Sequence, residues 1–166
     1  MSSGFYTRKP LLRMSRIEII GMFRPQRENL LLILHELQNN NPEHFISEED
    51  MIEIADYLNI TYSSVYGVVT YYSMFSRKPR GKYIIRVCRS PVCEMTRSEG
   101  TLKHLQKILD IKPGGTTTDR LFTLETTECL GRCDESPGMI INESFYGRLD
   151  FDKSEEIIDH LKSGER

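Results

Sequence analysis

Residues 125–138 read ETTECLGRCDESPG and place Cys129 and Cys133 in a loop between an expected strand and a proline turn. The other two cysteines of the chain, Cys88 and Cys93, follow a second expected strand, YIIRVC. Neighbouring strands that end on the same side of a sheet bring the loops after them together. We therefore expect the four thiols to converge on one point. Four sulfurs in a reducing compartment indicate a soft metal centre.

The composition is typical of a soluble globular protein. Of 166 residues, 28% are charged and 39% are hydrophobic, and the formal net charge is -2. These values give no strong attraction for polyanions and predict no nucleic-acid partner. No apolar run approaches the roughly eighteen residues of a membrane-spanning helix, so we expect no direct membrane insertion. The sequence predicts a cytoplasmic protein, soluble or peripheral to a membrane complex, in which cysteines stay reduced.

Three segments are expected along the chain, and together they predict an α+β fold class. Residues 1–24, basic at their start, predict an N-terminal arm docked on another surface. Residues 25–80 carry apolar side chains at helical spacing and predict a helical bundle. The basic stretch SRKPRGK, at 76–82, has the proline and glycine of a linker. Residues 81–166, where the period changes to that of strands, predict an α/β domain.

The bundle is predicted to contain three helices. The first covers about 26–40, the second begins after Ser47, and the third runs from Thr61 to Phe75, since Ser47 and Thr61 are capping residues. The third helix carries more aromatic side chains than one face can bury, and the remainder predicts a docking patch. These aromatic residues are Tyr62, Tyr66, Tyr71, Tyr72 and Phe75.

Strand and helix signals alternate in the C-terminal segment. Strands are predicted at 83–88 and 121–129, followed by a short strand GMIIN and a hairpin-like return through FYGRLDF. Helices are predicted at about 97–110 and 154–161. The order strand, helix, strand, strand, strand, helix is that of a small thioredoxin-like domain.

The cysteine spacing alone leaves several kinds of site open. Four residues separate the first pair and three separate the second, which suits a four-cysteine zinc site. A 2Fe-2S cluster fits at least as well, although the spacing is not that of plant-type ferredoxins. A reducing compartment disfavours disulfides, and dithiol exchange would require a C-x-x-C motif that the sequence lacks. Spacing favours the cluster only slightly over zinc.

The residues around the cysteines carry a resemblance to a known family. VCRSPVC, TTECLGRCDESPGMIIN and the preceding IADYLNITYSSVYGVVTYYSMFSRKPRGKY resemble the thioredoxin-like 2Fe-2S subunit of NADH dehydrogenases. Relatives of that subunit serve in electron-bifurcating hydrogenases and transhydrogenases, in NAD-linked hydrogenases and in formate dehydrogenases. The resemblance covers about residues 25–163. It implies a thioredoxin-like domain whose 2Fe-2S cluster is bound by Cys88, Cys93, Cys129 and Cys133.

The resemblance also implies a function. The chain would be a one-electron-transfer subunit of an NAD(P)H-dependent FMN flavoprotein oxidoreductase complex, exchanging electrons with the flavin of a partner subunit beside further iron–sulfur subunits. FMN and NAD(P) belong on the partner, because this sequence has neither a G-x-G-x-x-G motif after a strand nor a Walker motif. No catalytic residue is expected on this chain. The alternative from another class is a zinc-stabilised assembly module without redox activity.

Three residues near the cysteines are predicted to tune the reduction potential. Arg132, and with less force Arg89, would raise it by offsetting the negative charge that reduction adds. Gly131 would let backbone amides turn toward sulfur by adopting a positive φ. Pro137 suits either a turn or a cis peptide bond beside the site. The four histidines are expected in core or surface roles, because a Rieske centre would need two of them in place of cysteines.

Overall fold

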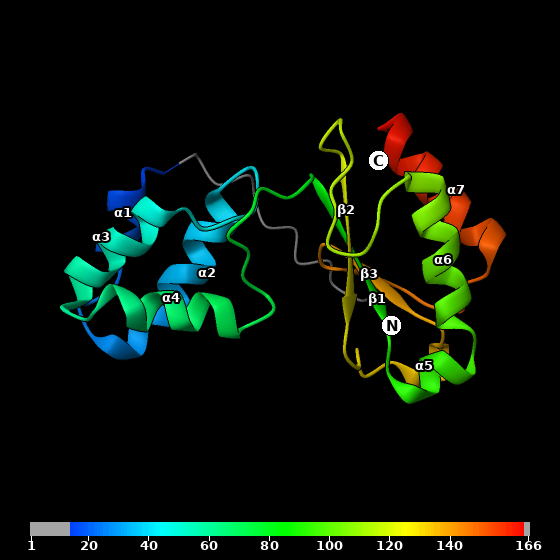
Figure 1. Ribbon diagram of the computed structural model, residues 1–166, viewed down its shortest axis with the longest axis horizontal. Coiled ribbons are helices and arrows are strands. Elements are labelled where there is room, and N and C mark those ends of the chain that lie inside the picture. The colour runs from blue at the N-terminus through cyan, green and yellow to red at the C-terminus, as the bar shows by residue number, and fades with distance from the viewer. Residues whose placement is uncertain (1–13, 165–166) are drawn as a thin grey trace, which may run out of the picture. The chain divides into compact units, whose positions relative to one another are not determined.

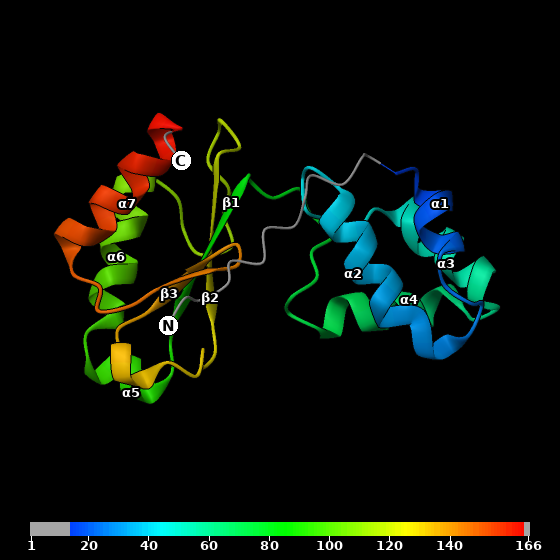
Figure 2. The same cartoon turned by 180° about the vertical axis from the view of Figure 1, so that it is seen from behind.

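The computed structural model describes residues 14–164, and the chain divides into two compact units between Pro79 and Arg80. The first unit is helical, and the second is a mixed sheet with helices on one face (Figures 1 and 2). The mixed helix and strand content agrees with the predicted α+β class. Each unit has a hydrophobic core of its own.

The helical unit consists of α1 (Arg16–Gly21), a 3-10 turn (Arg27–Asn29), α2 (Leu30–Asn40), α3 (Glu48–Leu58) and α4 (Tyr62–Tyr71). Their apolar stripes face one another, as helical periodicity requires of amphipathic helices. The fully buried members of the resulting core are Ile33, Leu34, Ile46, Ile54 and Val65.

The helix starts predicted at Ser47 and Thr61 are confirmed by their caps, whereas the helix predicted from about residue 26 begins as α2 at Leu30, after the 3-10 turn. The Ser47 hydroxyl accepts from the N–H of Asp50 at 3.1 Å, and the Asp50 carboxylate accepts from the N–H of Ser47 at 2.8 Å, which completes a capping box. The hydroxyl of Thr61 accepts from the N–H of Ser64 at the start of α4. That helix ends before the predicted Phe75, because the backbone of Tyr72 turns to an extended conformation.

The prediction of an arm over residues 1–24 is wrong for its last part. Arg16–Gly21 form α1, capped by a reciprocal pair of hydrogen bonds between Ser15 and Glu18. Ile19 and Ile20 are buried in the core of the helical unit. The unit therefore begins before residue 25, whereas residues 1–13 lie outside the described residues.

Within the described residues the second unit contains one four-stranded sheet of order β2-β1-β3-β4. Its strands are β1 (Tyr83–Cys88), β2 (Phe122–Thr127), β3 (Met139–Ile141) and β4 (Ser144–Tyr146). β1 pairs with β2 in parallel, and the other pairs are antiparallel. The parallel pair makes both strands end at the same edge of the sheet.

Helices cover one face of this sheet. α6 (Ser98–Leu109) and α7 (Phe151–Ser163) lie side by side there (Figures 1 and 2). α7 starts three residues before the predicted helix, because Asp150 caps it by accepting from the N–H of Lys153 at 2.8 Å. A short helix, α5 (Pro91–Met95), was not predicted. The buried core beneath the helices includes Ile85, Leu105, Phe122, Leu124, Met139 and Ile158.

The predicted linker belongs in part to the second unit. The Arg80 guanidinium is 4% exposed and lies 3.3 Å from the Glu125 carboxylate on β2. The N–H of Gly81 donates to the buried hydroxyl of Thr123 at 2.6 Å. Packed backbone therefore begins at residue 80, before β1. Across the described part of the chain, no helix has both the length and the apolar character needed to cross a bilayer.

We predict that Gly81→Ala destabilises the second unit by about 1–3 kcal/mol, as overpacking does. A Cβ at this position would lie 2.8 Å from backbone atoms of Phe122, which cannot move without disturbing the sheet. Urea denaturation of the full chain measures the loss.

Gly100→Ala is the matched control within the same unit. Its Cβ would meet the Phe151 ring at an ordinary 3.6 Å, so alanine should instead gain about 0.5–1 kcal/mol in the helix interior. Equal stabilities of the two variants would contradict the prediction.

Candidate metal centre

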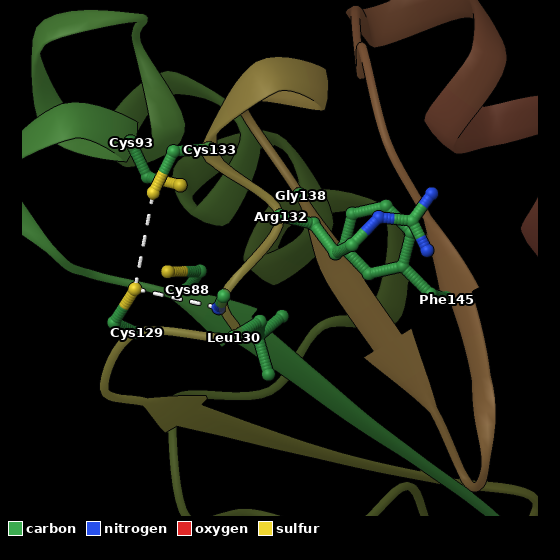
Figure 3. Close-up of a pocket in the computed structure, with 9 residues that line it drawn as sticks. Cys88, Cys93, Cys129, Leu130, Arg132, Cys133, Gly138 and Phe145 are labelled. Atoms are coloured by element: carbon green, nitrogen blue, oxygen red, sulfur yellow. Dashed lines mark hydrogen bonds between the residues drawn. The ribbon is translucent and has the colours of Figure 1, made fainter.

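The four cysteines line one pocket at the edge of the sheet where β1 and β2 end (Figure 3). Cys88 is the last residue of β1, and Cys93 lies in α5. Cys129 follows β2 by two residues, and Cys133 begins a 3-10 turn. The other residues that line the pocket are Leu130, Gly131, Arg132, Gly138 and Phe145. The predicted convergence of the two loops is therefore what the fold produces.

Backbone hydrogen bonds fix the loop that starts at Cys88. The N–H of Cys88 donates to the carbonyl of Gly138 at 3.1 Å, and the N–H of Arg89 donates to the carbonyl of Thr127 at 2.9 Å. The first bond joins the end of β1 to the segment before β3, and the second joins it to the end of β2. The first cysteine loop is thereby held from both sides.

The thiols gather as two pairs that differ in burial. Cys88 and Cys93 are 1% and 4% exposed, whereas Cys129 and Cys133 are exposed to solvent. The Sγ atoms of Cys129 and Cys133 lie 3.9 Å apart, close to the roughly 3.8 Å between two sulfurs bound tetrahedrally at about 2.3 Å to one ion. Within residues 14–164, no group of three or more His, Cys, Asp or Glu side chains is close enough to hold a single metal ion. A pair of thiols can serve each iron of a dinuclear cluster, so the donor set fits 2Fe-2S.

The thiols of the pocket influence one another. Burial raises the pKa of Cys88, but hydrogen bonds from Ser90, from the backbone at Leu130 and from Cys93 outweigh it and leave the pKa below its ordinary value. Burial and the hydrogen bond to Cys88 raise the pKa of Cys93. The pKa of Cys133 is raised by its hydrogen bond with Cys129 and by the negative charge that Cys129 carries as a thiolate. Within the first pair, Cys88 therefore becomes a thiolate more readily than Cys93.

Gly131 has the geometry that its predicted role requires. Its φ is +77°, in the left-handed region that glycine occupies without strain. Its N–H donates to the Sγ of Cys129 at 3.4 Å. The amide therefore faces the sulfur that a metal would bind, and we retain Gly131 as a proposed tuning residue.

The two arginines near the ligands both face carboxylates. Arg89 contacts Glu94 at 3.0 Å on the surface of α5. The guanidinium of Arg132 pairs with Glu135 and stacks over the ring of Phe145, 4.8 Å from its centroid. Figure 3 shows the Arg132 side chain turned toward Phe145 and away from the four sulfurs. A neighbouring negative charge therefore accompanies each positive charge.

Pro137 and the histidines are the remaining residues about which the sequence made predictions. The peptide bond between Ser136 and Pro137 is cis. No histidine lines the cysteine pocket within the described residues. His104 stacks on Phe151 with ring centroids 5.0 Å apart, and His35 contacts Phe75 at 4.8 Å.

Sequence reasoning did not identify two residues of the site. Ser90 lies beside Cys88, with its Oγ 3.4 Å from the sulfur. Phe145 lies beside the second cysteine loop, and the guanidinium of Arg132 stacks on its ring. A Cβ added at Gly138 or Gly147 would lie within 3 Å of that ring. The sequence contained a signal for Ser90, because Ser-Pro is typical of a helix start. Nothing in the sequence indicated Phe145.

Fold and site together define a class: a small thioredoxin-like domain that presents two pairs of thiols for a metal–sulfur group at one edge of its sheet. Residues 17–162 match the thioredoxin-like [2Fe-2S] ferredoxin family, and the chain belongs to it. The predicted fold and the predicted 2Fe-2S cofactor are therefore confirmed at the level of the family.

Two curated relatives illustrate the family, and both are subunits of NADH-quinone oxidoreductases. The chain is 41% identical over 129 residues to the one from Aquifex aeolicus (strain VF5), covering 78% of this chain and 79% of the relative. It is 45% identical over 109 residues to the one from Salmonella typhimurium (strain LT2), covering 66% of each chain.

The fold is also that of part of a solved structure. An NAD+-reducing [NiFe]-hydrogenase in the H2-reduced state matches with a TM-score of 0.73 at 21% identity, covering 84% of this chain and 23% of the hydrogenase chain. At this identity the likeness shows the shared fold alone.

We predict that Phe145→Ala weakens the hold of the second cysteine loop. The ring is half-buried, so its removal should lower the free energy of unfolding by about 2 kcal/mol, less than for a fully buried phenylalanine. The rate at which a chelator removes iron should rise accordingly.

Phe151→Ala serves as the control, because Phe151 is 55% exposed and contacts His104 rather than the cysteine loop. Equal rates of iron loss from the two variants would show that Phe145 does not support the site.

We further predict that Arg132→Ala changes the reduction potential only slightly, because Glu135 already offsets the guanidinium charge. The free energy of unfolding should fall by no more than about 1 kcal/mol, as for an exposed ion pair. This prediction departs from the expectation drawn from the sequence that Arg132 raises the potential, and a redox titration decides between the two. A clear fall in a redox titration of this variant, with Arg132→Lys at the wild-type value, would show that the charge acts on the cluster in spite of Glu135.

Proposed function

We propose that this chain is the 2Fe-2S subunit of an NAD(P)H-dependent flavoprotein oxidoreductase complex, in which it exchanges single electrons with the flavin of a partner subunit. Cys88, Cys93, Cys129 and Cys133 are the proposed ligands. When bound, the cluster supplies one-electron transfer at a potential set by its surroundings. The observation that carries the proposal is the meeting of four thiols, as two pairs, in one pocket of a chain of the [2Fe-2S] ferredoxin family.

The protein's own residues hold and orient the ligands. The sheet edge fixes Cys88, α5 carries Cys93, and the positive φ of Gly131 shapes the loop between Cys129 and Cys133. Burial of the first pair keeps water from those sulfurs, while exposure of the second leaves one side of the site open. An accessible edge suits transfer of an electron to another protein.

The identity of the complex is proposed from the curated relatives, which are named as subunits of NADH-quinone oxidoreductases. FMN, NAD(P) and the further iron–sulfur groups are placed on partner subunits, and the chain itself on the cytoplasmic side, where its thiols stay reduced. The aromatic side chains of and after α4 are proposed as one contact, since Tyr71 is 82% exposed and Tyr72 is 37% exposed. Isolated from its partners, the chain would carry electrons without catalysing a reaction.

The first test measures iron and acid-labile sulfide on anaerobically purified full-length protein, with an EPR spectrum after dithionite reduction. We expect about two irons and two sulfides per chain and a rhombic signal from one unpaired spin. Zinc without sulfide would overturn the proposal and favour the assembly module held by a structural metal.

Cysteine variants then test the ligands. Cys88→Ala and Cys129→Ala should each lose most of the iron, because each removes one of four thiolates. Met95→Ala is the control: it removes a sulfur-containing side chain that is 85% exposed on the same short helix as Cys93 and should retain full iron content. Full retention by either cysteine variant would remove that residue from the ligand set.

A further inference from the structure

Ser90 occupies an unusual position for a serine that precedes a helix. It is the residue before α5, where a serine side chain commonly caps the first free amides, yet its side chain makes no capping hydrogen bond. Its side chain is also largely withdrawn from solvent, with 6% of the residue exposed. A buried hydroxyl needs a partner, and here the partner is not the helix.

The partner is the sulfur of Cys88. The Oγ of Ser90 and the Sγ of Cys88 lie 3.4 Å apart. With Cys88 as a thiol, its S–H donates to the hydroxyl oxygen of Ser90. A cysteine that binds metal is a thiolate and has no proton to donate. The hydroxyl of Ser90 is then the donor and the sulfur is the acceptor.

Burial makes this hydrogen bond more effective than the nearby charges. Cys88 is 1% exposed, and a hydrogen bond in a medium of low dielectric is stronger than one in water. Arg89 is half exposed and paired with Glu94, so water and a carboxylate both weaken its effect. Of these two neighbouring residues, the neutral serine is the more buried, and it contacts the sulfur of a proposed ligand directly.

We propose that the Ser90 hydroxyl raises the reduction potential of the cluster by donating a hydrogen bond to the Cys88 sulfur. The inference deepens the proposed function and rests on Cys88 being a ligand. Reduction adds negative charge that spreads onto the thiolate sulfurs, so a donor stabilises the reduced state more than the oxidised state. One electron enters, from reduced flavin in the complex or from dithionite in the test. No bond breaks, and the proton stays on Oγ.

The test is a redox titration of the full-length chain, followed by absorbance and EPR, with four variants at two positions. Ser90→Ala should lower the equilibrium constant for reduction about threefold to tenfold, which is about 28–59 mV at 59 mV per tenfold for one electron. Ser90→Thr keeps a hydroxyl, so its reduction potential should stay near that of wild type. Ser90→Val has nearly the shape of threonine but no hydroxyl, so its potential should fall as that of the alanine variant does.

Ser98→Ala is the matched control. Ser98 is fully buried at the start of α6, and its hydroxyl has no hydrogen-bond partner in the described residues. Its removal should leave the potential unchanged, although it deletes the same atoms from an equally buried site. A fall of equal size in this control would overturn the proposal, because loss of any buried hydroxyl would then suffice.

Other outcomes are equally decisive. An unchanged potential in Ser90→Ala with full cluster content overturns the inference and leaves the proposed function intact. Cluster loading by the threonine variant but by neither alanine nor valine would assign the hydroxyl to holding the cluster, which also overturns a role in the potential. Wild-type protein without iron and sulfide would instead remove the proposed function, and the inference with it.

Discussion

The parallel pairing of β1 with β2 is the constraint on which the site depends. It places Cys88 opposite Thr127, two residues before Cys129. The end of β1 is also bonded on its other side, because the N–H of Cys88 donates to the carbonyl of Gly138. Both cysteine loops therefore leave the sheet from fixed positions at one edge. The arrangement of the two thiol pairs is set by backbone hydrogen bonds of the sheet rather than by contacts among the sulfurs.

An ion network helps to specify the register of that pairing. Arg86 lies opposite Glu125 and contacts it at 2.9 Å, and the buried guanidinium of Arg80 contacts the same carboxylate at 3.3 Å. A slip of one residue would turn Glu125 to the other face of the sheet. Separating a buried charge from its partner costs about 3–5 kcal/mol, so the slipped register is strongly disfavoured. Since Cys129 follows Glu125 by four residues, the same network fixes where the second loop begins.

Much of this arrangement could be predicted from the sequence, because strand ends and cysteines occur together in it. The short helices could not be found by periodicity: α1 and α5 are each too short to show a repeat. Their caps were the available signals, a Ser-x-x-Glu box before α1 and Ser90-Pro91 before α5. The contact between Ser90 and the sulfur depends on how two buried side chains are placed by the folded sheet, and no local pattern encodes that. The same holds for Phe145, which contacts the second cysteine loop from β4.

The arginines show why charges that lie close to a cysteine in sequence do not by themselves fix a tuning direction. Arg89 and Arg132 are close to cysteines in sequence, yet each reaches a carboxylate on the exposed side of the site. Exposed ion pairs are worth about 0–1 kcal/mol and are screened by salt. The buried side of the site contains neutral donors instead, and there the field of a single hydroxyl is weakened less by solvent. The charged side chains thus lie on the exposed side of the site, where another protein can bind. The Ser90 hydroxyl lies on the buried side, next to the sulfur of Cys88. A partner that covers the exposed side would exclude water from the arginines and their carboxylates alike, so docking itself would alter their effect on the potential far more than that of Ser90.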